Sequence, residues 1–95
     1  MFIVSGSYIK PIDEVERVLP AHKAYLDTLN EAGILVCCGP MKPRTGGVIL
    51  LGLESREMVD DILKDDPFNT EEIVEYSIIE FIPNKAAADL QRLLK

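Results

Sequence analysis

Residues 13–33 read DEVERVLPAHKAYLDTLNEAG, and the interpretation of the whole chain starts from this stretch. Its apolar side chains recur at the three- and four-residue spacing of one face of an α-helix. They are Val15, Val18, Leu19, Leu26 and Leu29. Asp13 is a favourable N-cap, and Gly33 is typical of the position just after a helix. Pro20 removes a backbone hydrogen bond, so we expect a kink or a restart of the helix there.

His22 is the only histidine of the chain, and the helical spacing places it on the apolar stripe. A buried imidazole needs a hydrogen-bond partner, because leaving it unpaired costs about 1–3 kcal/mol. One interpretation is a core histidine that a backbone carbonyl satisfies, and periodicity alone favours it. The other is a general acid or base that lines a pocket.

The rest of the chain alternates short apolar runs with helical patterns. Ser55 is a suitable cap for a second helix that ends before Pro67. The predicted strands are Phe2–Ile9, Ile34–Cys38, Val48–Leu53 and Ile73–Phe81, and a last helix is predicted over Ala86–Leu94. This β-α-β-β-α-β order with a C-terminal helix predicts a ferredoxin-like α+β fold with an antiparallel sheet. With 95 residues and no internal linker, we expect one domain over residues 1–95.

Composition excludes several classes of partner. The net charge of −6 and the pI near 4.6 argue against nucleic acid and anionic membranes. No apolar run approaches the roughly 20 residues that span a bilayer, and the N-terminus lacks the basic region of a signal peptide. Cys37 and Cys38 are adjacent and form no disulfide framework. We therefore expect a cytoplasmic protein with reduced thiols.

The predicted sheet is apolar on both faces. Two helices cover only one face of four strands, yet residues 34–38 and 48–53 are apolar throughout. Antiparallel sheets with a wetted face normally alternate polar and apolar residues. The second face is most economically covered by another copy of the chain, which predicts a homodimer packed sheet to sheet. In this interpretation Val74 and Tyr76 lie at the centre of the interface.

Several short motifs occur in a characteristic order. They are Pro20-Ala21-His22, Tyr25-Leu26 with Leu29, Gly33-Ile34, Gly39-Pro40, Gly47 and Asp65-Asp66-Pro67-Phe68. In order and spacing they resemble the YciI-like family, over nearly the whole chain up to Phe81. The resemblance implies a dimeric α+β barrel and a site built from His22 and Asp66. It also implies that elimination chemistry is possible, since one relative is a dehydrochlorinase of a chlorinated hydroxyhydroquinone and muconolactone isomerase shares the barrel.

Asp66 has two interpretations from the sequence itself. Pro67 keeps it out of the helical region, so it is a natural N-cap with Pro67 at the first position of a short helix. It is also the candidate partner of His22, since a carboxylate fixes the tautomer of an imidazole and stabilises its protonated form. Asp65 next to it is expected to be solvated at the end of the second helix.

Four further residues are candidates for binding a substrate. Ser5 and Ser7 share one face of the first strand, where they line a polar cavity or face solvent. Arg44 belongs to a loop that is solvated or closes over an anionic ligand. Phe68 is a packing residue or a wall of the pocket.

Other types of site find little support. Cys37 and Cys38 lie in mid-strand and point to opposite faces, which favours small hydrophobic residues over a nucleophile. One histidine and a vicinal cysteine pair do not give the spacing of a metal site, and Gly46-Gly47 lacks the residues of a phosphate loop. No cofactor is expected.

Three functions agree with this sequence. The first is a cofactor-independent enzyme in which His22 and Asp66 move protons in an elimination or isomerisation of a small polar or aromatic molecule. The second is a module that binds such a molecule without turning it over. The third is a structural homodimer in which His22 belongs to the core.

Overall fold

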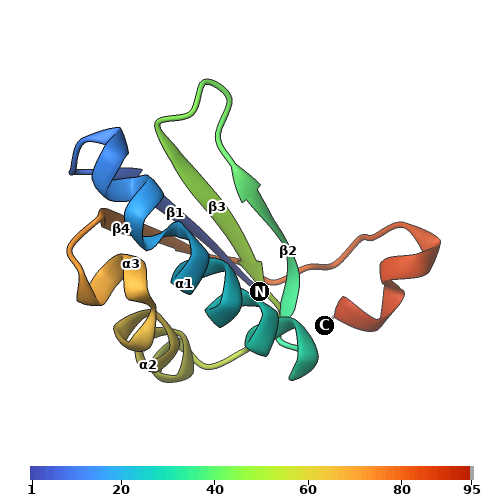
Figure 1. Ribbon diagram of the computed structural model, residues 1–95. Coiled ribbons are helices and arrows are strands. Elements are labelled where there is room, and N and C mark those ends of the chain that lie inside the picture. Colours follow the sequence, from blue (N-terminus) through green and yellow to red (C-terminus); the bar gives the residue numbers. More distant parts are fainter. Residues whose placement is uncertain (95) are drawn as a thin grey trace.

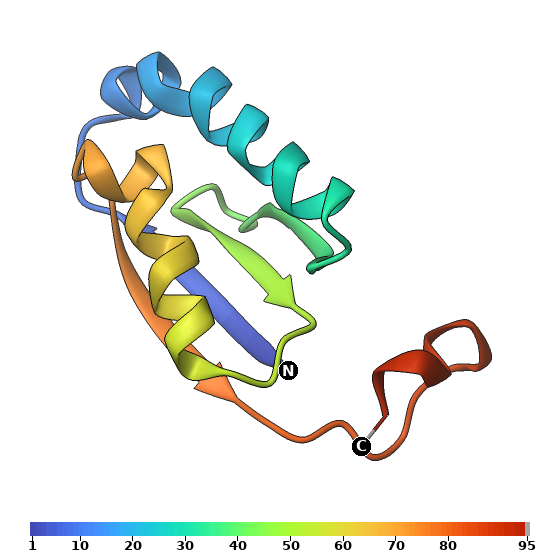
Figure 2. The same cartoon turned by 90° about the horizontal axis from the view of Figure 1, so that it is seen from below.

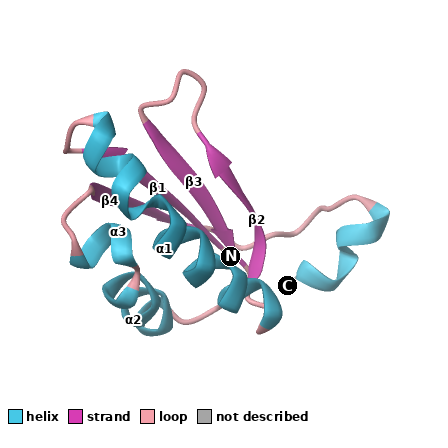
Figure 3. Ribbon diagram, viewed as in Figure 1, coloured by secondary structure: helices cyan, strands magenta, loops and turns pink. Residues whose placement is uncertain are grey.

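The computed structural model describes residues 1–94, and it is an antiparallel sheet with helices on one face (Figures 1 and 3). The elements follow the order β1, α1, β2, β3, α2, α3, β4 and a terminal 3₁₀ helix. Their bounds are β1 Phe2–Tyr8, α1 Ile12–Glu31, β2 Leu35–Pro40, β3 Gly46–Leu51, α2 Arg56–Asp65, α3 Pro67–Thr70, β4 Val74–Glu80 and η1 Ala88–Leu93. The predicted ferredoxin-like α+β class and its antiparallel four-stranded sheet are confirmed.

The strands lie in the order β2-β3-β1-β4, and every neighbouring pair is antiparallel. The helices α1, α2 and α3 lie on the same side of this sheet (Figure 2). No helix of the described residues covers the opposite side, which we call the open face. No helix of the described residues is long and apolar enough to cross a membrane.

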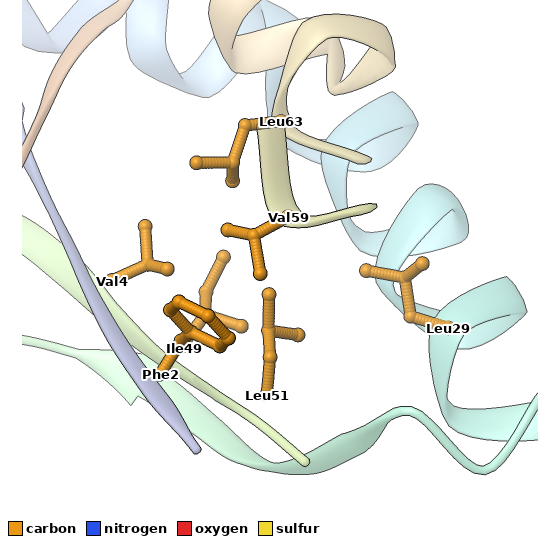
Figure 4. Close-up of a cluster of buried hydrophobic side chains, with 7 residues drawn as sticks. All are labelled: Phe2, Val4, Leu29, Ile49, Leu51, Val59 and Leu63. Atoms are coloured by element: carbon orange, nitrogen blue, oxygen red, sulfur yellow. The ribbon is translucent and has the colours of Figure 1, made fainter. Parts of the chain in front are cut away.

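Two groups of buried side chains fill the space between the sheet and the helices. The larger one joins β1 and β3 to α1 and α2 (Figure 4), and it consists of Phe2, Val4, Leu29, Ile49, Leu51, Val59 and Leu63. The smaller one consists of Val15, Val18, Phe68, Ile73 and Val74. It holds the first half of α1 against α3 and the start of β4, and this is where the candidate site lies.

The register corrects the prediction for β4. Gly6, which lies on the same face as the buried Val4, pairs with Tyr76. Val74 is buried in the smaller core and Tyr76 packs against both cores, so both face the helices and cannot lie in an interface through the open face. On this face the hydroxyl of Tyr76 donates to the buried carboxylate of Asp66 in the helical layer.

The open face carries the other set of side chains. Ile3 pairs with Leu50 on one side and with Ile79 on the other, so these three residues form a row across the sheet. Ile79 is 58% exposed. The two-sided apolar character predicted for the sheet is therefore present, with Ile3, Leu50 and Ile79 in place of Val74 and Tyr76.

Helix α1 also differs from the prediction in two details. It begins at Ile12, with Pro11 at the N-cap and no side-chain cap, so Asp13 lies in the first turn. Of the two alternatives predicted at Pro20, a kink or a restart, the restart does not occur: the helix continues through Pro20, which is exposed, so water can satisfy the carbonyl that loses its partner. His22 consequently lies in the middle of the helix, away from the free N–H groups of a first turn.

The C-terminal segment forms η1 over Ala88–Leu93, a 3₁₀ helix where an α-helix over Ala86–Leu94 was predicted. The segment projects from the end of the sheet (Figures 1 and 2). None of its helical residues is buried, so it lacks the packing that stabilises most helices in proteins.

Candidate active site

Asp66 lies at the junction of α2 and α3 and is 1% exposed. Because Pro67 follows, its backbone is extended, with φ −66° and ψ 128°. Its Oδ1 accepts the backbone N–H of Phe68 at 2.9 Å, so Asp66 is the N-cap of α3 with Pro67 inside the first turn. The capping role predicted for this residue is confirmed, while Asp65 beside it is exposed.

The same carboxylate contacts the single histidine. Nδ1 of His22, in the middle of α1, lies 2.8 Å from Oδ1 of Asp66, and the side chain of His22 is 12% exposed. A carboxylate that accepts from Phe68 N–H has the pattern of an ionised acceptor, so the proton of the His22–Asp66 hydrogen bond belongs on Nδ1. In the neutral imidazole this leaves Nε2 as the unprotonated nitrogen. Capping and pairing with His22 are thus compatible roles of one side chain.

Tyr76 is the third partner of Asp66, and the sequence interpretation missed it in this role. Tyr76 belongs to β4, and its hydroxyl donates to Oδ2 of Asp66 at 2.7 Å. Burial raises the pKa of the Tyr76 phenol strongly, and the charge of Asp66 raises it further, so the phenol remains a donor at every ordinary pH. The alternation of β4 contained the signal, since it places Tyr76 on one face with the buried Val74.

Phe68 fixes the histidine from a second direction. Its ring is stacked on the imidazole of His22, with centroids 3.8 Å apart and planes 6° from parallel. The rings of Tyr8 and Phe68 form a T-shaped pair, with centroids 6.3 Å apart. Phe68 is buried, and it also lines the cavity described next, so both roles considered for it are present.

A cavity of about 510 Å³ opens between α1 and the sheet beside His22. Its walls are mainly apolar, with Leu19, Leu26, Val48, Ile49, Phe68 and Val74 among them. The polar side chains of the lining are Tyr8, Glu16, His22, Lys23, Arg44 and Tyr76. A small organic molecule fits such a space, and the imidazole of His22 is the one histidine side chain in its lining.

Arg44 reaches the cavity from the loop between β2 and β3. Its guanidinium donates to the carboxylate of Glu16 on α1, and both residues line the cavity, so the loop is tied to the helix beside it. Hydrogen bonds to Glu16 and to Tyr8 raise the pKa of Arg44, whose charge is permanent in any case. Lys42 of the same loop does not line this cavity.

Ser5 and Ser7 lie elsewhere. Ser5 pairs with Val48 and Ser77 on the open face, where its hydroxyl is 3.5 Å from the carbonyl oxygen of Ser77. Ser7 alternates to the same face, and neither serine lines the cavity. Ser5 and Ser7 therefore do not lie beside a substrate at His22. The residues of β1 that line the cavity are Gly6 and Tyr8, which alternate with the two serines.

The two cysteines point to opposite faces as predicted, and both are free and exposed. Cys38 pairs with Ile49 and lines the cavity, while Cys37 pairs with Leu50 of the open face. Partial desolvation, with smaller contributions from Cys37 and Asp27, raises the pKa of the exposed Cys38 thiol, which disfavours the nucleophilic thiolate. Among residues 1–94, no cluster of three or more histidine, cysteine or acidic side chains is arranged to hold a metal ion.

Comparisons with known proteins identify a family and a similar fold. The family model of the YCII-related domain matches residues 1–82. Among solved structures, 5-chloro-2-hydroxyhydroquinone dehydrochlorinase (TftG) from Burkholderia phenoliruptrix AC1100, in complex with 2,5-dihydroxybenzoquinone, is similar, with a TM-score of 0.72 and 20% identity. The match covers 85% of this chain and 93% of that one, and it shows a shared fold. No curated protein sequence matches the chain. Because the family model matches most of this chain, the chain belongs to the family of YCII-related domains.

Proposed function

We propose that this protein is a cofactor-independent enzyme in which His22 and Asp66 transfer a proton to and from a small polar or aromatic molecule. The observation that carries the proposal is the arrangement of His22. Its Nδ1 is held by a buried carboxylate at 2.8 Å, its ring is stacked on Phe68, and it lines a cavity large enough for an organic ligand.

The chemistry follows from the tautomer. With the proton on Nδ1, Nε2 of His22 accepts a proton from an acidic C–H or O–H group of the substrate. The imidazolium that forms is stabilised by the negative charge of Asp66, as in other carboxylate–histidine pairs. In an elimination, the electron pair of the broken C–H or O–H bond forms a new double bond while the bond to the leaving group breaks, a chloride departs as the anion, and the imidazolium then releases its proton to water. In an isomerisation, the imidazolium returns the proton to another carbon of the same molecule. Proton transfer of this kind uses no redox or group-carrying cofactor.

The substrate class follows from the cavity and from the similar structure. Apolar walls with a few polar groups suit a flat molecule with hydroxyl or carbonyl substituents. TftG is a dehydrochlorinase, and its structure contains 2,5-dihydroxybenzoquinone. A hydroxylated aromatic or quinone-like substrate and an elimination reaction are therefore the first to test for this chain.

The proposal includes a homodimer formed through the open face. Ile3, Leu50 and Ile79 are a row of apolar side chains there, and no element of the described residues covers them. A second copy presenting the same row would remove this surface from water. Free thiols at Cys37 and Cys38 agree with the reducing conditions of the cytoplasm, where we place the protein.

A screen of metabolites and halogenated hydroxyaromatics against wild type and His22→Ala in parallel tests the proposal. Turnover of a compound by wild type, lost in a folded His22→Ala variant that still binds it, is the expected result. Binding by both proteins with turnover by neither would overturn the enzymatic function and indicate a binding module. Binding of no compound by either protein would favour a structural dimer.

A further inference from the structure

The carboxylate of Asp66 has three donors that come from three different elements. Oδ1 accepts from His22 Nδ1 at 2.8 Å and from the backbone N–H of Phe68 at 2.9 Å. Oδ2 accepts only from the Tyr76 hydroxyl, at 2.7 Å. Within the described residues no buried side-chain polar atom is left without a partner, so Tyr76 completes a fully satisfied network.

Rotation of the carboxylate would break this network. If Asp66 turned about its last side-chain bond, the oxygen facing His22 and Phe68 would no longer be held in place. The hydroxyl of Tyr76 prevents this, because it anchors the oxygen that neither His22 nor Phe68 contacts. Burial and the charge of Asp66 raise the pKa of the Tyr76 phenol, which favours its protonated, donating form.

We infer that Tyr76 is a positioning residue for His22, acting through Asp66. It fixes the carboxylate in the orientation that keeps the imidazole proton on Nδ1 and Nε2 free to accept a proton from the substrate. Tyr76 lines the cavity, but its hydroxyl is engaged by Asp66. This inference rests on the proposed function for its effect on turnover, while its effect on His22 is measurable without any substrate.

The chain offers a matched control. Tyr25 also contacts the larger core, and its hydroxyl donates to the carbonyl oxygen of Ile62 at 2.8 Å. Tyr25 does not line the cavity and makes no hydrogen bond to Asp66. Tyr76→Phe and Tyr25→Phe each remove one engaged phenol hydroxyl and keep the ring, so they differ mainly in whether Asp66 loses a partner.

The first readout is proton NMR of the single histidine. A hydrogen-bonded Nδ1 proton gives a separate resonance far downfield, and it exchanges slowly while Asp66 holds it. We expect this resonance in wild type and in Tyr25→Phe, and its broadening or loss in Tyr76→Phe. An unchanged resonance in a folded Tyr76→Phe variant would overturn the inference, whatever the outcome for His22→Ala.

The second readout is turnover of the compound found by the screen. We expect Tyr76→Phe to lower kcat about tenfold with KM nearly unchanged, less than the roughly 10²–10⁴-fold that a general base contributes. A rise in KM alone, with kcat intact, would place Tyr76 in substrate contact and contradict the positioning role. If His22→Ala retains turnover while the NMR result holds, the proposed function fails and the positioning of His22 stands.

A third variant keeps the test valid if Tyr76→Phe does not fold. In a Tyr8→Phe, Tyr25→Phe background, Tyr76 is the only tyrosine, since the chain has three. Incorporation of 3-fluorotyrosine then keeps the hydroxyl and makes it a stronger donor to Asp66. The Nδ1 resonance of His22 should shift, and its failure to move would count against the inference.

Discussion

The imidazole of His22 lies flat on the ring of Phe68, with centroids 3.8 Å apart and planes 6° from parallel. The two residues are 46 positions apart in the chain and come from α1 and α3. Phe68 follows the very dipeptide, Asp66-Pro67, whose aspartate binds Nδ1 of the same histidine. One short turn therefore supplies both the charge partner and the stacking partner of His22.

Phe68→Leu should remove the stacking and leave the hydrogen bond to Asp66 in place. Ring protons above the face of an aromatic ring resonate upfield, so we expect the His22 ring protons to move downfield in this variant. Phe2→Leu is the control, because Phe2 is equally buried but belongs to the larger core. Both variants should lose about 1–2 kcal/mol of stability. Identical His22 spectra in all three proteins would contradict the stacked arrangement.

Asp66→Asn and Asp66→Ala should separate the capping role of Asp66 from its charge. Asparagine is as good an N-cap as aspartate, so it keeps the bond to Phe68 N–H. Alanine removes the cap and leaves the Tyr76 hydroxyl without an acceptor, which should cost about 2 kcal/mol more in urea unfolding. Both variants should lose turnover, because neither stabilises an imidazolium at His22. Full activity in Asp66→Asn would show that the charge is dispensable.

The free energy of unfolding at alkaline pH should depend on the ionisation of the Tyr76 phenol. The pKa of Tyr76 is raised in the folded state. Its contribution to the free energy of unfolding is therefore complete below about pH 10, where the tyrosine of the unfolded chain is still neutral. Above that pH the unfolded chain loses a proton that the folded protein keeps. Stability therefore falls by up to about 1.4 kcal/mol per pH unit from this residue.

Urea unfolding of wild type and Tyr76→Phe at about pH 9 and about pH 11 measures this effect. The variant is less stable at the lower pH, since Oδ2 of Asp66 loses its partner. The difference between the two proteins should shrink by about 1 kcal/mol at the higher pH, because phenylalanine does not titrate. A constant difference would mean that the Tyr76 phenol ionises as readily in the folded protein as in the unfolded chain.

Two exposed apolar residues test the assembly. Ile79 on the open face is 58% exposed and Met58 on α2 is 48% exposed in the single chain. Light scattering of wild type should give about twice the chain mass of 10.6 kDa at micromolar concentration. Ile79→Glu should reduce this to the monomer mass, since a charge would lie in an apolar interface. Met58→Glu should leave the dimer intact. A monomer mass for wild type would contradict the proposed dimer.

Arg44 should contribute to the binding of anions at the mouth of the cavity. Arg44→Ala should weaken the binding of a hydroxybenzoate anion several-fold and leave the binding of the corresponding neutral amide unaffected. Added salt should reduce the difference in hydroxybenzoate affinity between wild type and variant. Arg17→Ala is the control, because Arg17 pairs with Glu14 and Glu71 and does not line the cavity. Calorimetry that finds equal effects for both arginines would remove Arg44 from the binding site.

Periodicity and end signals in the sequence predicted the elements and the class of fold. The stripe on residues 13–33 and the Ser55 cap each depend on neighbours a few positions apart, so they can be read locally. The Ser55 hydroxyl indeed accepts the N–H of Met58 at 3.3 Å. The pair of His22 and Asp66 came from the family resemblance, because nothing in the spacing of the two residues shows that α1 and α3 are neighbours.

What the sequence did not reveal is which face of the sheet the helices cover. Alternation in β4 separates Tyr76 from Ser77 but treats the two faces alike. The choice depends on partners distant in the chain, and for Tyr76 that partner is the carboxylate of Asp66 at 2.7 Å. The same ambiguity left open whether Ser5 and Ser7 line a cavity or face solvent, and the residues of β1 that line the cavity are Gly6 and Tyr8.

Solvent exchange into a substrate measures whether His22 is the base. The compound selected by the screen is incubated in D₂O with wild type or with His22→Gln, and NMR follows the loss of its acidic C–H signal. If Nε2 of His22 is the base, wild type exchanges or converts the compound, and His22→Gln does so at least about 100-fold more slowly while still binding it. Exchange at the wild-type rate in His22→Gln would show that His22 is not the base.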